Sequence, residues 1–236
     1  MDLIEVSNNT KRHPWELSRT KCIIKELETL GIKGKVLDIG CGDGYFDRKL
    51  IEKFPDIEVY GVDINLEHES NEGRLHFLNS LDSLPACQFE YIIMMDVLEH
   101  IKDDAGYLRQ LLLKLKDNGK LLITVPAFMR LYSLHDRELR HYRRYEHKRL
   151  HRVLKKCGLI EKNWSYFYLS LIFGRLLTIN STQNLSGWYY SEKALKTRLV
   201  SFVLNTDYSV LRILSKVGIH LPGLSLLSIC EKKQKK

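Results

Sequence analysis

The sequence has no long hydrophobic run, no closely paired cysteines and no internal repeat, and these absences exclude several classes of protein. Its longest apolar stretch, Tyr166 to Phe173, is far shorter than the roughly 20 residues that a membrane-spanning helix needs. The five cysteines contain no CxxC pair, which argues against a zinc ribbon or a disulfide framework and is typical of reduced thiols. The first residues, MDLIEVSNNTKRHPW, lack the apolar segment of a signal peptide. We therefore expect a cytoplasmic protein.

What the chain does have is a globular composition and an excess of positive charge. Its 236 residues, 44% of them hydrophobic, suffice for one large domain with a sizeable core. The formal net charge of +8 favours an anionic partner, which could be a phosphorylated substrate, a nucleic acid or an acidic membrane surface. Charge alone does not choose among these three.

A glycine-rich turn follows the first apolar run of the chain. Val36, Leu37 and Ile39 predict a short buried strand that leads directly into the turn. The turn has the pattern G-x-G-x-G, and glycine lets the backbone adopt positive φ and lets a ligand approach closely. Residues 45–54 then show helical spacing. A strand, a glycine turn and a helix in this order are typical of a binding site for a nucleotide-like ligand.

Strand and helix patterns alternate along most of the chain. The expected strands cover residues 35–39, 58–62, 75–78, 89–95, 120–125, 159–167 and 224–229. The expected helices cover residues 11–30, 45–53, 105–115, 148–157, 168–179 and 191–217. Alternation at this rhythm implies parallel crossovers, so we expect an α/β fold with a doubly wound, mostly parallel sheet.

Four motifs, in order over residues 35–126, resemble those of class I S-adenosylmethionine-dependent methyltransferases. VLDIGCGDGYF resembles the first motif, VYGVDIN the second, FEYIIMMDVLEHI that of the fourth strand, and GKLLITVP the fifth strand with its proline. Another Rossmann protein, such as a dehydrogenase, would explain the glycine turn but not the DVLEH string. The resemblance implies a seven-stranded Rossmann-like sheet whose antiparallel last strand is inserted beside the sixth.

The resemblance also implies S-adenosylmethionine as the cofactor. Asp63 should hold the ribose hydroxyls, and its position about 20 residues after the glycine turn agrees with that role. Ile64 should pack on the adenine. Many members carry an acid after the third strand for the adenine amine, whereas Ser80 or the backbone of Leu81 would have to serve here. The expected cofactor-binding residues are Asp38, Gly40, Cys41, Gly42, Gly44, Asp63, Ile64, Ser80, Leu81 and Asp96.

A narrower resemblance covers the second half of the chain. VPAFMRLYSLHDRELRHYRRY, together with RHPWELSR and PGLSLLSICEKK, is similar to a bacterial subset associated with surface-polysaccharide and lipid-linked sugar pathways. It implies methyl transfer to a hydroxyl of a sugar or of a lipid-linked glycan. The alternatives are a small-molecule O- or N-methyltransferase of a biosynthetic pathway and a non-catalytic cofactor-binding subunit associated with RNA or protein.

We expect one domain over residues 1–236. Its parts are an N-terminal helical cap at 1–34, a cofactor-binding core at 35–167, a helical insertion or lid at 168–222, the last strand at 223–231 and a basic tail at 232–236.

His135, in the loop after the fifth strand, is the leading candidate for the general base. A histidine can take a hydroxyl proton at neutral pH, and Asp136 beside it would orient or charge the ring. His141 and Tyr142 are second choices. The alternative is a histidine that only hydrogen-bonds its own loop.

Asp96, Glu99 and His100 form a D-x-x-E-H pattern that could bind a divalent metal, with His135 as a fourth ligand. It resembles the E-x-x-E-H metal site of the ubiquinone-pathway O-methyltransferases and of the small-RNA 3′-end methyltransferases, although Asp96 is shorter. In metal-free members the corresponding residues cap the helix and line the cleft. We therefore regard a metal as possible but do not expect one.

A run of basic residues spans positions 137–152. In one interpretation Arg143 and Arg144, with Tyr145, bind a phosphate or diphosphate of a lipid-linked or nucleotide-linked sugar, because arginine forks match phosphate geometry. The others are a nucleic-acid patch and a solvated helix face, and we favour the latter from position 148 onward. Since no RNA-binding fold is appended, we expect an anionic small-molecule or lipid-linked acceptor and no nucleic acid.

The insertion has two interpretations. It could be a lid over the acceptor that is partly lipid-facing, with the stretch Tyr166 to Ile179 resting peripherally on the inner membrane face. It could equally be a helical cap packed on the sheet. Trp15 and Arg19 in the first helix could close over the cofactor, or the tryptophan could belong to the core.

Overall fold

The computed structural model describes residues 12–178 and 195–233, so residues 179–194 of the expected insertion and the end of the basic tail lie outside the described residues. Its strands are β1 (Gly34–Ile39), β2 (Ile57–Val62), β3 (Ser70–Glu72), β4 (Leu75–Leu78), β5 (Phe89–Met95), β6 (Leu115–Pro126), β7 (Leu159–Phe167) and β8 (Ser225–Lys232). Its α-helices are α2 (Pro14–Thr29), α3 (Tyr45–Lys53), α4 (Asp104–Leu111), α5 (Leu134–Glu138), α6 (His147–Lys156), α7 (Leu169–Thr178) and α8 (Leu195–Lys216). Two 3₁₀ turns, η1 (Leu98–His100) and η2 (Met129–Leu131), follow β5 and β6.

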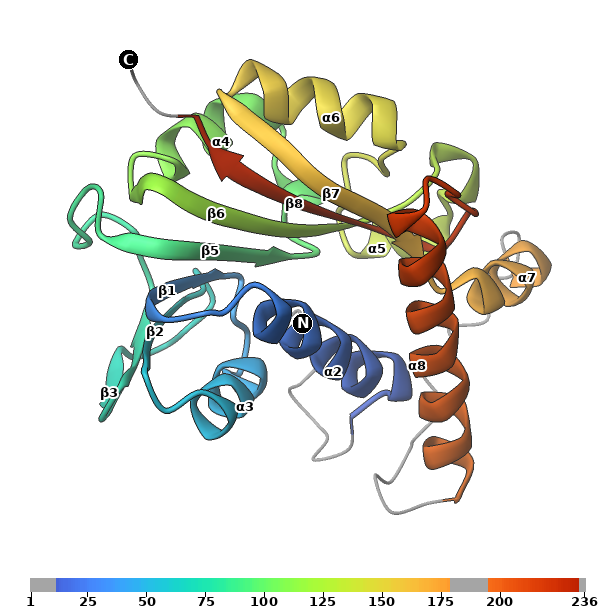
Figure 1. Ribbon diagram of the computed structural model, residues 1–236, viewed down its shortest axis with the longest axis horizontal. Coiled ribbons are helices and arrows are strands. Elements are labelled where there is room, and N and C mark those ends of the chain that lie inside the picture. Colours follow the sequence, from blue (N-terminus) through green and yellow to red (C-terminus); the bar gives the residue numbers. More distant parts are fainter. Residues whose placement is uncertain (1–11, 179–194, 234–236) are drawn as a thin grey trace.

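The strands form one sheet in the order β3-β4-β2-β1-β5-β6-β8-β7. Neighbours from β4 to β6 are parallel, and β8 lies antiparallel between β6 and β7 (Figure 1). The predicted insertion of the last strand is therefore confirmed. The described sheet has eight strands, because the short β3 pairs antiparallel with β4 at the edge. The carboxyl ends of β1, β2, β5 and β6 meet at one edge, where a ligand of such a fold binds.

Helices cover both faces of the sheet, as the doubly wound prediction requires (Figure 1). On one face α4 and α6 bury apolar side chains such as Leu108 and Leu150 against the strands. On the other face α2, α3 and α8 contribute Ile23, Leu50 and Leu204 to a second core. Each such fully buried side chain stabilises the fold by about 1.5–3 kcal/mol.

The insertion packs on the body of the protein. The buried guanidinium of Arg212 in α8 binds both carboxylate oxygens of Glu26 in α2, at 2.7 Å each, and the Tyr208 hydroxyl donates to the same carboxylate at 2.9 Å. The stretch from Tyr166 is not one amphipathic surface helix, because Tyr166 and Phe167 are buried in β7 and the helix α7 begins only at Leu169. Through Arg212 and Tyr208, α8 thus packs against α2.

Among residues 12–178 and 195–233, no helix is both long enough and apolar enough to cross a membrane.

The largest error in the predicted elements lies near residue 115. The expected helix over 105–115 ends at Leu111, and Leu115 instead begins β6, fully buried opposite Phe89. The β5–β6 register is irregular between Phe89 and Tyr91, and Asn118 adopts a positive φ of 62° within β6. Because β6 begins irregularly, the apolar residues up to Leu115 keep a spacing like that of a helix, and the predicted helix therefore extends too far.

Candidate active site

The glycine turn packs closely against neighbouring side chains, which leaves no space for a Cβ at two of its positions. Gly40 and Gly44 have φ of 74° and 73°, which glycine adopts without strain, and Gly44 caps the N-terminus of α3. A Cβ at Gly40 would clash with Val97, and one at Gly44 would clash with Phe77. The amides of Gly40 and Gly44 donate to the carbonyls of Val62 and Cys41, so what the turn places at the carboxyl end of β1 is the N-terminus of α3.

Asp63 connects the end of β2 to this turn. Its Oδ2 accepts a hydrogen bond from the Gly42 amide at 3.0 Å, and its Oδ1 accepts one from the Asn65 amide at 2.9 Å. The next side chain, Ile64, is 86% exposed. A buried acid beside an exposed aliphatic side chain fits a ligand that has hydroxyl groups next to a flat apolar ring.

Ser80 and Leu81 follow β4 and lie close to Asp63, whose amide donates to the carbonyl of Leu78 at 3.1 Å. The Ser80 hydroxyl oxygen accepts from the Asp82 amide at 3.1 Å, which leaves its own proton for a ligand. Leu81 packs partly against the core. Both positions are compatible with the expected contact to the adenine.

Asp38 and Asp47 form a pair of buried carboxyl groups beneath the turn. Burial raises the pKa of Asp38 to about 7, and burial together with the charge of Asp38 raises the pKa of Asp47 well above its usual range. One carboxyl of the pair is therefore protonated at neutral pH. The side chain of Cys41 is also buried and lies against the backbone of Gly61, so it is the backbone of Cys41 that a cofactor could reach.

Asp96 ends β5 in a left-handed backbone conformation, with φ of 55°. Its carboxylate pairs with the buried guanidinium of Arg19 from α2 and accepts from the Thr124 hydroxyl at 3.2 Å. Arg19 also lies over the ring of Trp15, 4.4 Å from its centroid. The first helix thus brings a cation to the carboxyl ends of the central strands.

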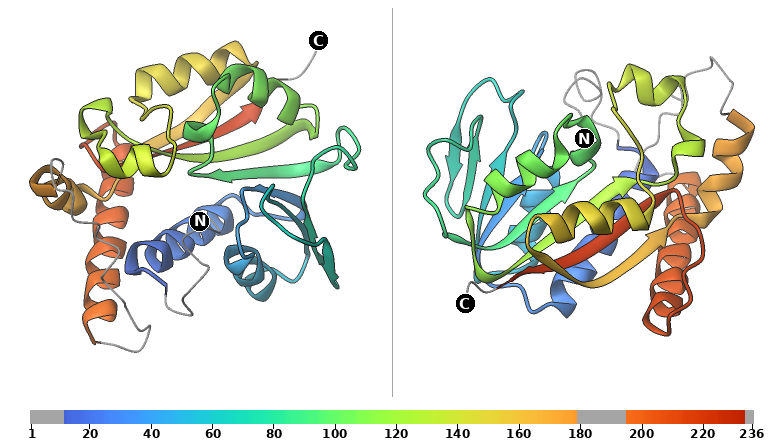
Figure 2. Two further views of the ribbon diagram at one scale, coloured as in Figure 1. Left: turned by 180° about the vertical axis from the view of Figure 1, so that it is seen from behind. Right: turned by 90° about the horizontal axis from the view of Figure 1, so that it is seen from above.

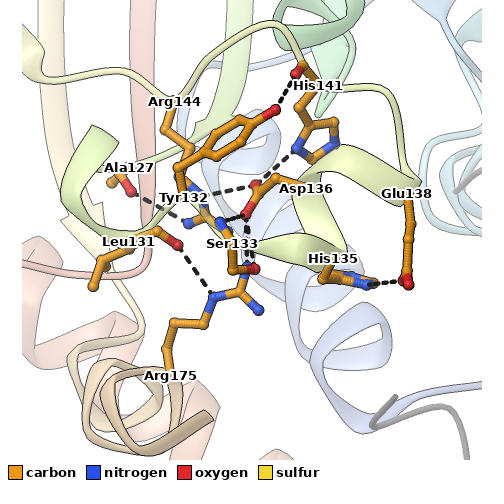
Figure 3. Close-up of polar contacts among 10 residues, drawn as sticks. All are labelled: Ala127, Leu131, Tyr132, Ser133, His135, Asp136, Glu138, His141, Arg144 and Arg175. Carbon is orange, nitrogen blue, oxygen red and sulfur yellow. Dashed lines mark hydrogen bonds and ion pairs between the residues drawn. The ribbon is translucent and has the colours of Figure 1, made fainter. Parts of the chain in front are cut away.

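Asp136 is the centre of a buried polar network in the loop after β6 (Figure 3). Its Oδ1 accepts from Nδ1 of His141 at 2.9 Å and from Nε of Arg144 at 2.8 Å. Its Oδ2 accepts from Arg175 at 2.7 Å and from the Ser133 amide at 2.9 Å. Burial acts to raise the pKa of Asp136, but these hydrogen bonds and cations hold it well below the usual range. The carboxylate is therefore ionised and fixes the tautomer of His141, whose Nδ1–H must donate.

The expectation that Asp136 orients His135 is wrong, because its carboxylate turns to His141 instead. The side chain of His135 is 49% exposed, and its Nδ1 lies 4.0 Å from Glu138 (Figure 3). Burial and the charge of Arg175 lower the pKa of His135, and the charge of Asp136 opposes them.

The expected phosphate grip by the basic segment is also contradicted. Arg144 is buried against Asp136, and Arg143 pairs with Asp104 at 3.0 Å. Tyr145 is fully buried and donates to the same Asp104 at 3.0 Å. Asp104 lies 39 residues before Arg143, whereas Asp136 is buried in the same loop as Arg144. Each carboxylate neutralises its arginine within the fold.

Glu99, His100 and His141 form the group that could hold a divalent metal near this site. One ligand atom from each lies within 4.8 Å of the others, and the two rings meet edge to face at 4.6 Å. Burial and the charge of Asp96 raise the pKa of Glu99 well above its usual range. The group thus contains His141 as a possible ligand instead of Asp96 and His135, which the sequence pattern suggested. Its carboxylate oxygen and imidazole nitrogens are donors that fit a divalent ion.

Comparisons with known proteins place this geometry in context. Residues 18–160 match the family model described as a methyltransferase domain. The ubiquinone biosynthesis O-methyltransferase of Idiomarina loihiensis is 31% identical over 114 residues, which cover 42% of this chain and 45% of the relative. The trans-aconitate 2-methyltransferase of Rhodopseudomonas palustris is 27% identical over 99 residues, 39% of each protein.

A solved S-adenosylmethionine-dependent methyltransferase from Archaeoglobus fulgidus has the same fold. It aligns with a TM-score of 0.53 and 21% identity, over 90% of this chain and 94% of the other. The chain spans less than half the length of the curated relatives that it matches.

Proposed function

The chain belongs to the methyltransferase-domain family, and from this premise we propose that it transfers a methyl group from S-adenosylmethionine to a hydroxyl acceptor. The observation that carries the proposal is the glycine turn at the end of β1, which is joined to Asp63 at the end of β2 through the Gly42 amide. When bound, the cofactor supplies an electrophilic methyl group on a sulfonium.

The residues at the carboxyl edge of the sheet fit this cofactor. The backbone of Gly40 to Gly44 and the carboxyl of Asp38 would hold its amino-acid part, and Asp63 would hold the ribose hydroxyls. Ile64 and Ser80 would contact the adenine. Arg19 would balance the negative charge of the acids in this region and of the methionine carboxylate.

His141 is the proposed general base. Because its Nδ1–H donates to Asp136, its Nε2 keeps the lone pair that can remove a proton from a hydroxyl. In this role Asp136 positions the imidazole and fixes its tautomer, as an acid does in other acid–histidine pairs. His135, which is half exposed on α5, is the second candidate.

A sugar or lipid-linked glycan is the proposed acceptor, on the strength of the resemblance in the second half of the chain. The relatives support a small-molecule acceptor as the second candidate, because two of them are named for ubiquinone biosynthesis and for trans-aconitate. Since Arg143 and Arg144 are held by internal acids, the expected anionic group of the acceptor has lost its strongest support. We propose a cytoplasmic location from the unpaired cysteines, all five of which are free thiols.

A labelled-methyl assay tests the proposal. The protein and labelled S-adenosylmethionine are incubated with cell-envelope, soluble-metabolite and RNA fractions, and Asp63→Ala serves as the matched inactive variant. Label in envelope glycan supports the sugar acceptor, and label in the soluble fraction supports the small-molecule alternative. Binding of the cofactor with no label in any fraction would point to the non-catalytic subunit instead.

A further inference from the structure

A second group of metal-ligating side chains lies at the outer edge of the sheet. His147 and His151 stand four residues apart on α6, so both rings lie on one face of the helix. Glu161 comes from β7, the edge strand next to β8. One ligand atom from each side chain lies within 4.8 Å of the others. Figure 2 shows α6 along this end of the sheet, with β3 at the opposite end.

The three ligand atoms converge on one point. Nε2 of His147 lies 2.9 Å, and Nδ1 of His151 lies 2.6 Å, from the same carboxylate oxygen, Oε2 of Glu161. A ring nitrogen directs its proton or its lone pair along the same line in the ring plane. Both imidazoles are therefore directed at Oε2, so a cation bound among the three atoms would replace the two hydrogen bonds.

Further contacts hold two of the three ligands in place. The Ser228 hydroxyl donates to Oε1 of Glu161 at 2.6 Å, which leaves Oε2 for the histidines. The ring of Trp164 stacks on His147, with centroids 3.5 Å apart and an interplanar angle of 8°. The side chain of Glu161 is only 6% exposed. Outer contacts of this kind orient the ligands of protein metal sites.

We propose that His147, His151 and Glu161 bind a divalent transition-metal ion of the zinc type. Two imidazole nitrogens and one carboxylate oxygen form a ligand set that zinc takes, at about 2.0–2.2 Å. Ligand atoms around a tetrahedral ion of that size lie roughly 3.3 Å apart. The two histidine nitrogens must therefore move away from Oε2 of Glu161 by roughly half an ångström to admit the ion. The side chain of His151 is 44% exposed on a surface helix and can make this movement through its own torsions.

The fourth position of the ion faces solvent. A surface hollow of about 460 Å³ is lined by His147, Lys148, His151 and Arg152, and a water or an anion can enter from it. Lys148 and Arg152 place two positive charges beside these imidazoles. The two cations also attract an anion, so the open position suits an anionic fourth ligand.

Titration of the full chain with Co²⁺ tests the site, because tetrahedral Co²⁺ absorbs visible light much more strongly than the hydrated ion. His151→Ala removes a ligand at the surface, and His68→Ala is the matched control, since it removes an exposed histidine outside the cluster. We expect the wild type and His68→Ala to bind one more equivalent of Co²⁺ than His151→Ala does. If His151→Ala still binds that equivalent, its Kd for Co²⁺ should be at least about tenfold higher. Zn²⁺ should displace this equivalent.

The comparison counts only the difference between variants, so any metal at Glu99, His100 and His141 does not affect it. Circular dichroism verifies that all three proteins keep the same helix content, and Glu161→Gln provides a second variant. If the wild type shows no such equivalent, or if His151→Ala binds Co²⁺ as His68→Ala does, the cluster is only a hydrogen-bonded part of the fold and the proposal is overturned. Neither result depends on methyl transfer.

Discussion

Nδ1 of His141 lies 2.9 Å from Oδ1 of Asp136, and the same carboxylate binds the guanidinium groups of Arg144 and Arg175. Residues of the loop after β6 and Arg175 of α7 therefore meet at one carboxylate. The imidazole is held in one orientation and one tautomer, which is what a general base needs.

This pair predicts which histidine matters for catalysis. His141→Asn should lower kcat by about 10²- to 10⁴-fold with little effect on cofactor affinity, because it removes the proton acceptor. The control His135→Ala should retain near-normal kcat. Steady-state kinetics on the acceptor found by the labelled-methyl assay provides the measurement. A large loss in His135→Ala with normal turnover in His141→Asn would reverse the assignment.

The buried acids beneath the glycine turn predict an unusual dependence of stability on pH. Because burial raises the pKa of Asp38 and Asp47, the folded protein keeps protons that the unfolded chain releases near pH 4. The free energy of unfolding should therefore fall as the pH rises from about 4 to about 7. Asp47→Asn should reduce this slope and stabilise the cofactor-free protein at pH 8 by about 1 kcal/mol or more.

Urea unfolding of the wild type and Asp47→Asn at several pH values measures this effect. The matched control is Asp56→Asn, which changes an exposed aspartate. Parallel pH profiles for the wild type and Asp47→Asn would show that the pair does not titrate as described.

The contact between α2 and α8 predicts a large stability effect. Arg212→Met leaves the buried carboxylate of Glu26 without its cation and should lower the free energy of unfolding by about 3–5 kcal/mol. The control Lys53→Met breaks an exposed pair with Glu28 and should cost about 1 kcal/mol or less. Denaturant unfolding of both variants compares the two costs. Equal costs would mean that α8 is not anchored through this pair.

Arg19 predicts an electrostatic contribution to cofactor binding. Arg19→Met leaves the carboxylate of Asp96 without its cation, so the site should repel the methionine carboxylate and raise the Kd at least about tenfold. Arg19→Lys keeps the charge and should lose less. Calorimetric titration of both variants measures the difference, and an unchanged Kd in Arg19→Met would exclude this role.

Some of these features could be predicted from the sequence because they are local. The glycine turn, the strand before it and Asp63 form a short segment in which each residue type has a direct backbone consequence. The strands over 75–78 and 159–167 have the predicted bounds, and a glycine lies just before each of them. β3 was missed because its three exposed residues show no apolar pattern.

The polar networks could not be predicted because they depend on pairs that are distant in sequence. Arg175 lies 39 residues after Asp136, and nothing in either local pattern indicates that they meet. Arg143 and Arg144 belonged to a basic run that resembled an anion-binding surface. Only the fold shows that Asp104 and Asp136 neutralise them from within.

Isothermal titration with S-adenosylmethionine tests the central claim most directly. The wild type should bind one equivalent with a Kd in the micromolar range, about −8 kcal/mol. Gly42→Arg should abolish binding, because Gly42 has φ of 58° and its amide binds Asp63. Circular dichroism verifies that the variant keeps the overall fold. A wild type that binds no cofactor, or a Gly42→Arg variant that binds it unchanged, would contradict the assignment of this turn as the cofactor site.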